Sequence, residues 1–264
     1  MNRLSSRPAP AIRFIEFMGL PGSGKSTIAA CLEADLRQRG IKTVSRSLEL
    51  ADHAPFLWRQ CRRFLRVVRN AGRCRHLYLD AFKLIATSGQ KSSLDLAKVT
   101  WNFWSVVALM ADCRASRDSV IIIDQGLFQA IWSIQLSASK ALSVDICNGL
   151  LRSAGVTDIL VVNIQPDIPL ASNRLLARAF KGTRLNSQLQ DTPAGSWQMA
   201  AENIATLMDL AQTVLPRDRF GDRVITIEND TTCPKAAAAE IASVFLSRTR
   251  PQERPEVIDL GGNV

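Results

Sequence analysis

The sequence lacks the segments that mark membrane-spanning and zinc-binding proteins. No apolar run approaches the roughly 20 residues that a transmembrane helix needs, and the first eleven residues lack the apolar stretch of a signal peptide. The chain has only two histidines, and its six cysteines include no C-x-x-C pair, so we expect no structural zinc site. We therefore expect a soluble, cytoplasmic protein with reduced cysteines.

Acidic residues are missing from two long segments. Between His53 and Leu79 there are seven arginines and no Asp or Glu, and these arginines account for most of the formal net charge of +9. Between Ile168 and Gln190 the charged residues are all basic: Arg174, Arg178, Lys181 and Arg184. Charge concentrated in this way favours an anionic ligand or surface at these segments over a protein that is basic everywhere.

Apolar runs alternate with helical patterns along the chain. The predicted strands are residues 12–18, 42–47, 120–123, 158–164 and 223–229, and the predicted helices include 28–39, 55–89, 93–114 and 234–246. Val120 to Ile123 are four consecutive apolar residues, which is typical of a central parallel strand buried on both faces. This alternation predicts an α/β fold with a doubly wound sheet and right-handed crossovers.

The segment GLPGSGKST, from Gly19 to Thr27, meets the spacing G-x-x-x-x-G-K-[ST] between the first strand and the first helix. Its glycines let backbone N–H groups surround a phosphate, and the following helix points its positive end there. We expect Lys25 to act on the β- and γ-phosphates of ATP and the Ser26 hydroxyl to bind Mg²⁺. The residues expected to contact the nucleotide are Gly19, Pro21, Gly22, Ser23, Gly24, Lys25, Ser26 and Thr27.

Two further features complete a predicted phosphate site. Asp124 ends the third strand, where a carboxylate can hold Mg²⁺ through its water shell. After the fourth strand, Arg174 and Arg178 share one helix face, and Arg184 follows in a loop. We expect this segment to be a lid, with Arg178 and Arg184 as catalytic phosphate contacts and Arg174 as a nucleotide contact. A solvated basic helix is the alternative.

These motifs resemble the nucleoside monophosphate kinase superfamily, most of all its thymidylate kinase-like branch. The resemblance covers roughly residues 12–246 and is carried by FIEFMGLPGSGKST, KTVSRS, IIIDQG, the lid and IEND. It implies a three-layer, five-stranded parallel sheet, Mg²⁺ and ATP as cofactors, and transfer of the γ-phosphoryl group to a second molecule. It also implies that Asn229, in the loop after the fifth strand, lies beside the adenine.

The acceptor half of the site departs from this family. Gln125 follows Asp124 where thymidylate kinases usually carry an arginine, and no Glu-Pro pair follows the second strand. A nucleoside monophosphate is therefore disfavoured as the acceptor. Glu49, near the end of the second strand, is the first candidate for the general base, and Asp52 is the second.

The arginine-rich insertion has no counterpart in the family. Six of its arginines recur at spacings of three and four, which predicts a helix with a basic face and an apolar face of Phe64, Leu65, Val67 and Val68. Three interpretations are open: a solvated basic face over a core helix, a pocket for an anionic acceptor, or a contact of Arg59 to Arg75 with anionic lipid. Nucleic acid is less favoured.

We expect a single domain over residues 12–247, with an insertion at about 53–117 and the lid at about 174–196. Flexible segments are expected at 1–11 and 248–264. The leading functional hypothesis is an ATP-dependent small-molecule kinase. The alternatives are a nucleotide-operated regulatory ATPase and a thymidylate-like kinase, and a homodimer is left open. A GTP switch is disfavoured because no N-K-x-D motif occurs.

Overall fold

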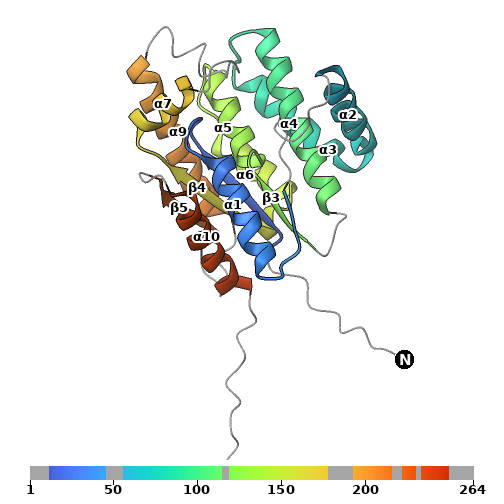
Figure 1. Cartoon of the computed structure of the whole chain (residues 1–264). Helices are drawn as coiled ribbons and strands as arrows, with labels where there is room; N and C mark the ends of the chain where they lie inside the picture. Colours follow the sequence, from blue (N-terminus) through green and yellow to red (C-terminus); the bar gives the residue numbers. More distant parts are fainter. Residues whose placement is uncertain are drawn as a thin grey trace, which may run out of the picture.

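The computed structural model describes residues 12–45, 56–114, 119–177, 193–215, 222–229 and 233–249. One sheet runs through the molecule (Figure 1). Its strands are β1 (Phe14–Gly19), β2 (Thr43–Ser45), β3 (Val120–Ile123), β4 (Ile159–Gln165) and β5 (Val224–Glu228). They are all parallel, in the order β2-β3-β1-β4-β5. The predicted five-stranded parallel α/β fold is confirmed.

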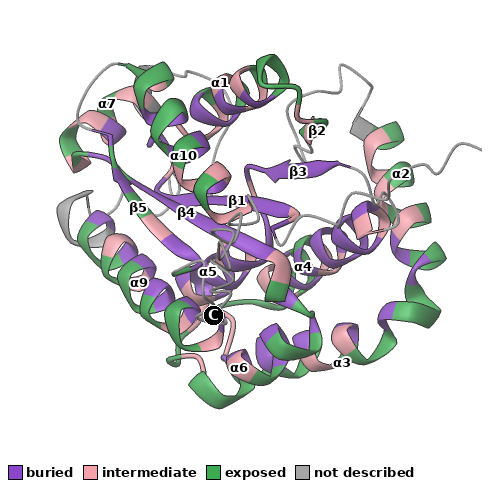
Figure 2. Cartoon of the chain, turned by 90° about the horizontal axis from the view of Figure 1, so that it is seen from below, coloured by how far each residue is buried: buried purple, intermediate pink, exposed green. Residues whose placement is uncertain are grey.

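Helices cover both faces of this sheet, as Figures 1 and 2 show. The described α-helices are α1 (Lys25–Gln38), α2 (Phe56–Arg69), α3 (Ala71–Thr87), α4 (Ser93–Arg114), α5 (Leu127–Ser137), α6 (Val144–Ser153), α7 (Ile168–Ala177), α9 (Pro193–Val214) and α10 (Pro234–Thr249), of which α2 packs on α4 and α3. One core cluster joins the sheet to α1 and α10, and a larger cluster joins its other face to α4, α5, α6 and α9.

Strand β1 lies in the centre of the sheet and is buried along its whole length. Because side chains alternate across a strand, Ile15 and Phe17 face α1 and α10, while Phe14 and Met18 belong to the opposite cluster. Glu16 occupies a position between Phe14 and Met18 on that second face. The strand therefore carries one carboxyl group into an otherwise apolar layer.

The arginine-rich insertion differs from its prediction in two ways. The single helix expected over residues 55–89 is broken at Asn70, whose side chain donates to the carbonyl of Arg66 and so competes with the backbone pattern. Val67 is buried, but Phe64, Leu65 and Val68 are exposed. Of the three interpretations of this insertion, a solvated basic face over a core helix does not fit these exposures, because polar side chains such as Arg66 lie on the side of α2 that contacts α4.

Other boundaries shift by a few residues. Helix α10 ends at Thr249 and so includes two residues that were assigned to the tail, while residues 1–11 and 250–264 lie outside the described residues. Most of the predicted lid, residues 178–192, lies outside them too. None of the described helices is long and apolar enough to cross a membrane.

Candidate functional site

The phosphate loop leaves the carboxyl end of β1 and enters α1. Gly22 and Gly24 have φ angles of +85° and +90°, a conformation that side chains disfavour. A Cβ atom at Gly22 would lie 2.2 Å from the carbonyl oxygen of Ala171 on α7. Gly24 is the N-cap of α1, so the amino terminus of that helix opens onto the loop. The loop therefore has the backbone conformation and the helix end that an anion site requires.

Lys25 turns back into the loop. Its ammonium group donates to the carbonyl oxygens of Gly19 at 2.7 Å and of Leu20 at 2.8 Å, with the Ser23 hydroxyl at 3.4 Å. A point charge held at this position can interact with phosphate oxygens inside the same loop. The contacts are consistent with the role predicted for Lys25.

The side chains of Ser26, after β1, and Asp124, after β3, lie close together at the carboxyl ends of these neighbouring strands. The Ser26 hydroxyl, in the first turn of α1, donates to Oδ2 of Asp124 at 3.1 Å, and Asp124 is buried at the end of β3. A hydroxyl and a carboxylate are hard oxygen ligands, which suit Mg²⁺ because this ion usually keeps several waters and phosphate oxygens as its other ligands. The donor set therefore fits Mg²⁺. No cluster of three or more His, Cys, Asp or Glu side chains occurs in the described ranges.

Two further predicted residues lie against the other side of the loop. Asn229 follows β5 and is buried, and its amide Nδ2 donates to the carbonyl of Ser23 at 2.7 Å. The guanidinium of Arg174, on α7, lies 3.9 Å from the position that a Cβ atom would take at Gly24. Both residues, predicted as nucleotide contacts, are thus neighbours of the loop in the structure.

Glu16 is a site residue that the sequence analysis missed. It is fully buried, and its carboxylate accepts hydrogen bonds from the backbone N–H groups of Leu127, Phe128 and Gln129 at 3.0, 2.7 and 3.1 Å. Burial raises its pKa to about 7, although the three hydrogen bonds act in the opposite direction. A charged residue inside the run FIEFM was the available signal, because an acid on a buried strand needs partners.

The first turn of α5 links Glu16 to the phosphate loop. The side chain of Gln129 accepts a hydrogen bond from the backbone N–H of Gly19 at 3.3 Å. Gly126, just before α5, leaves no room for a side chain, since a Cβ atom there would lie 2.3 Å from the carboxyl carbon of Glu16. Glu16 and Gln129 therefore fix the short segment between Asp124 and α5 against β1.

The remaining predicted residues are less constrained. Pro21 is partly exposed in the loop, Thr27 is exposed, and Gln125 is partly exposed after β3. Glu49, Arg178 and Arg184, predicted as the general base and the lid contacts, lie outside the described residues, and their roles stay predictions.

The sequence matches no model of a known protein family, and no curated protein matches it. Several solved structures align with most of the chain, among them two kinases. The APS kinase CysC of Mycobacterium tuberculosis, in complex with AMPPNP and APS, is 13% identical with a TM-score of 0.39, over 90% of this chain and 99% of that chain. Deoxyadenosine kinase from M. mycoides, with bound dCTP, is 13% identical with a TM-score of 0.44, over 87% of this chain and 98% of that chain.

Both likenesses are distant. The fold class therefore rests on the strand order and on the loop between β1 and α1, which together define a P-loop kinase-like fold. The function must be argued from the residues of the site.

Proposed function

We propose that the chain is a magnesium-dependent phosphotransferase that uses ATP as its donor and a small, anionic molecule as its acceptor. The observation that carries the proposal is the 3.1 Å contact between the Ser26 hydroxyl and the Asp124 carboxylate, beside a phosphate loop that already contains the Lys25 ammonium. This combination of a cation and two oxygen ligands suits a nucleoside triphosphate with its metal ion.

Each residue has a distinct task in this proposal. The loop amides and the amino terminus of α1 bind the phosphates, Lys25 neutralises negative charge on them, and Ser26 and Asp124 hold Mg²⁺. Bound there, Mg²⁺ supplies positive charge to the phosphate oxygens. In the reaction, the bond between the β–γ bridging oxygen and the γ-phosphorus breaks, an acceptor oxygen bonds to that phosphorus, and the acceptor proton passes to a base.

Arg174 favours transfer over simple nucleotide binding. Its guanidinium lies beside Gly24, so a second cation reaches the loop from α7. Cations aimed at the phosphoryl group stabilise the charge that develops during transfer. Arg178 and Arg184 are proposed to extend this set, and Glu49 is proposed as the general base.

The test is phosphoryl transfer from γ-labelled ATP to a panel of small hydroxyl and phosphate-bearing acceptors, which includes nucleoside monophosphates, with and without Mg²⁺. Lys25→Ala is expected to abolish transfer, and Asp124→Asn is expected to raise the Mg²⁺ concentration needed for half-maximal transfer. Lys42→Ala is the matched control. Lys42 is exposed and directly precedes β2, so it lies at the amino ends of the strands, whereas the phosphate loop lies at their carboxyl ends.

Two results would contradict the proposal. One is turnover in Lys25→Ala equal to that of the wild type. The other is nucleotide binding without transfer to any acceptor, together with a protein partner whose affinity differs between ATP and ADP, which would indicate a regulatory ATPase instead. Transfer to nucleoside monophosphates alone would assign the thymidylate-like activity.

A further inference from the structure

Helix α2 carries a continuous apolar surface that is largely exposed to solvent. The spacing of three and four residues places five large side chains on one side of the helix. We call this set the α2 apolar face, and its members, with their exposed fractions, are Leu57 (75%), Trp58 (55%), Phe64 (56%), Leu65 (64%) and Val68 (53%). A soluble helix normally turns such a face inward, so this exposure needs an explanation.

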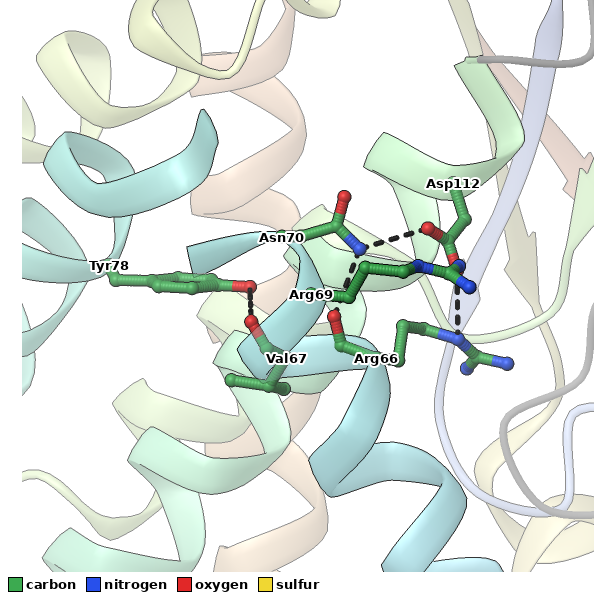
Figure 3. Close-up of polar contacts among 6 residues, drawn as sticks. All are labelled: Arg66, Val67, Arg69, Asn70, Tyr78 and Asp112. Atoms are coloured by element: carbon green, nitrogen blue, oxygen red, sulfur yellow. Dashed lines mark hydrogen bonds and ion pairs between the residues drawn. The ribbon is translucent and has the colours of Figure 1, made fainter. Parts of the chain in front are cut away.

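The helix is held in this orientation by its polar side. The carboxylate of Asp112, on α4, forms ion pairs with the guanidinium groups of Arg69 at 2.6 Å and Arg66 at 3.3 Å (Figure 3). It also accepts a hydrogen bond from the side-chain amide of Asn70 at 2.9 Å. Burial alone would raise the pKa of Asp112, but the hydrogen bonds from Arg69 and Asn70 hold it below its ordinary value. The carboxylate is therefore charged at neutral pH and anchors the carboxyl end of α2.

Two further contacts of α2 agree with this orientation. The indole N–H of Trp101 donates to the side-chain oxygen of Gln60 at 3.1 Å, and Val67 is buried, with its carbonyl accepting from the Tyr78 hydroxyl at 3.4 Å. Phe64 stacks on Trp101 at the rim of a hollow of about 530 Å³ that the α2 apolar face helps to line. Figure 2 places α2 at the outer edge of the molecule, beyond α4.

Arginines border the apolar face. Arg62 is exposed, and its guanidinium lies 5.7 Å from the ring centroid of Trp58, while the Arg69 side chain is 70% exposed. Arg73 and Arg75 continue the exposed positive charge onto α3. Asp112 pairs with Arg66 and Arg69, and the segment between positions 53 and 79 itself has no acidic residue, so Arg62, Arg73 and Arg75 supply the positive charge at the margin of this apolar surface.

We propose that α2 docks on the surface of membranes that contain anionic phospholipids. The apolar face would enter the boundary between headgroups and acyl chains, and the bordering arginines would lie at the level of the phosphates. Trp58 suits such a boundary because its indole is apolar over most of its area and polar at one edge. The proposal is independent of the phosphotransferase function.

A second copy of the chain fits this surface less well. A symmetric contact through the α2 apolar face would bring the arginines of both copies into one interface. No acidic residue of the same segment could pair with them, and Asp112 already receives Arg66 and Arg69. Like charges at an interface oppose association, whereas an anionic bilayer complements them.

The experiment is co-sedimentation of the full chain with vesicles of neutral phosphatidylcholine, with or without phosphatidylglycerol. Binding is expected only to the anionic vesicles and should weaken as salt is added. Leu65→Glu should lower the partition coefficient by about tenfold or more, since a fully buried leucine side chain is worth about one to two powers of ten. Val144→Glu is the matched control, because Val144 is similarly exposed (57%) on α6.

Folding and nucleotide binding separate a specific effect from a damaged protein. Leu65→Glu should keep the unfolding midpoint and the protection by Mg-ATP of the wild type, since Leu65 makes no part of the phosphate site. Quenching of tryptophan fluorescence by brominated lipid should fall in Trp58→Phe.

Three outcomes would overturn the proposal. The first is that the wild type does not bind anionic vesicles. The second is that Val144→Glu and Leu65→Glu lose binding equally. The third is that the wild type is a dimer without vesicle binding and becomes monomeric in Leu65→Glu. The last would assign the α2 apolar face to a second copy.

Discussion

The carboxyl group of Glu16 should make the stability of this protein depend on pH. Its ordinary pKa is 4.5, and burial in the layer between β1 and α5 raises the folded-state pKa to about 7, against the opposing effect of three backbone hydrogen bonds. Since each factor of ten in a proton-binding constant corresponds to about 1.4 kcal/mol, this difference corresponds to about 3 kcal/mol of folding free energy.

The direction of the effect follows from the raised pKa. The folded protein holds this proton to a higher pH than the unfolded chain does. The contribution of Glu16 to stability is therefore fully present below about pH 4.5 and is lost as the pH rises through about 7. Above that pH the fold must hold a charged carboxylate in a buried position.

Urea unfolding of the wild type and of Glu16→Gln, at several values from about pH 5 to pH 8, measures this contribution. Glutamine has nearly the same shape but does not titrate. It also loses one acceptor for the α5 amides, which gives the variant a constant cost of about 1–3 kcal/mol. On top of that constant, the stability of the variant relative to the wild type should rise by about 2.5 kcal/mol across this range, since part of the full effect lies below pH 5.

Glu240→Gln serves as the control, because Glu240 is exposed on α10 and remote from α5 in the sequence. Its stability curve should run parallel to that of the wild type. If the curve of Glu16→Gln is parallel to the wild type as well, Glu16 does not titrate in this range, and the assignment of its raised pKa is refuted.

Two further predictions concern the phosphate loop. Gly22→Ala and Gly40→Ala both place a side chain on a residue with positive φ, at a cost of about 1–2 kcal/mol. The new Cβ atom would clash with Ala171 in Gly22→Ala, whereas nothing lies within 4 Å of it in Gly40→Ala. Chemical denaturation should therefore find Gly22→Ala the less stable variant, and only it should lose protection by Mg-ATP; equal behaviour would contradict the close packing of α7. Asn229→Ala removes the amide that donates to the Ser23 carbonyl, and should cost about 1–3 kcal/mol in the same assay; an unchanged midpoint would mean that the bond contributes nothing.

The fold was predictable because its determinants are local. The apolar run at Val120 to Ile123 needs no distant partner to be recognised as a buried strand. The phosphate loop was equally recognisable, since the positions of Gly19, Gly24 and Lys25 are fixed by the backbone geometry of the loop itself. The meeting of Ser26 with Asp124 followed from the rule that parallel strands bring their carboxyl ends to one edge of the sheet.

The orientation of α2 was not predictable in this way. Its helical periodicity was identified correctly, but periodicity states only that one side is apolar and the other basic. Which side faces the core depends on Asp112 and Trp101, both on α4 and more than thirty residues away in the chain. The apolar side of α2 does not turn inward, because the ion pairs with Asp112 and the hydrogen bond between Gln60 and Trp101 hold its opposite side against α4.

Glu16 was missed for a related reason. Within the strand, its neighbours Ile15 and Phe17 indicate a buried position, and the sequence alone offers no partner for a carboxylate there. The partners are backbone N–H groups at the start of α5, about 110 residues later, which have no sequence signature. Near those N–H groups, Gly126 leaves space for the carboxyl group of Glu16. This role of the glycine can be recognised only once the two segments are packed together.

This packing links the phosphate loop to the Ser26–Asp124 pair. Glu16 binds the first turn of α5, Gln129 of the same turn accepts from Gly19, and the segment before that turn carries Asp124, which receives Ser26. A shift of α5 would therefore move the proposed magnesium ligand and the start of the phosphate loop together. Because catalysis by positioning depends on ligands held to within a fraction of an ångström, loss of the Glu16 contacts should lower the proposed phosphoryl transfer even though Glu16 is fully buried and lies outside the phosphate loop.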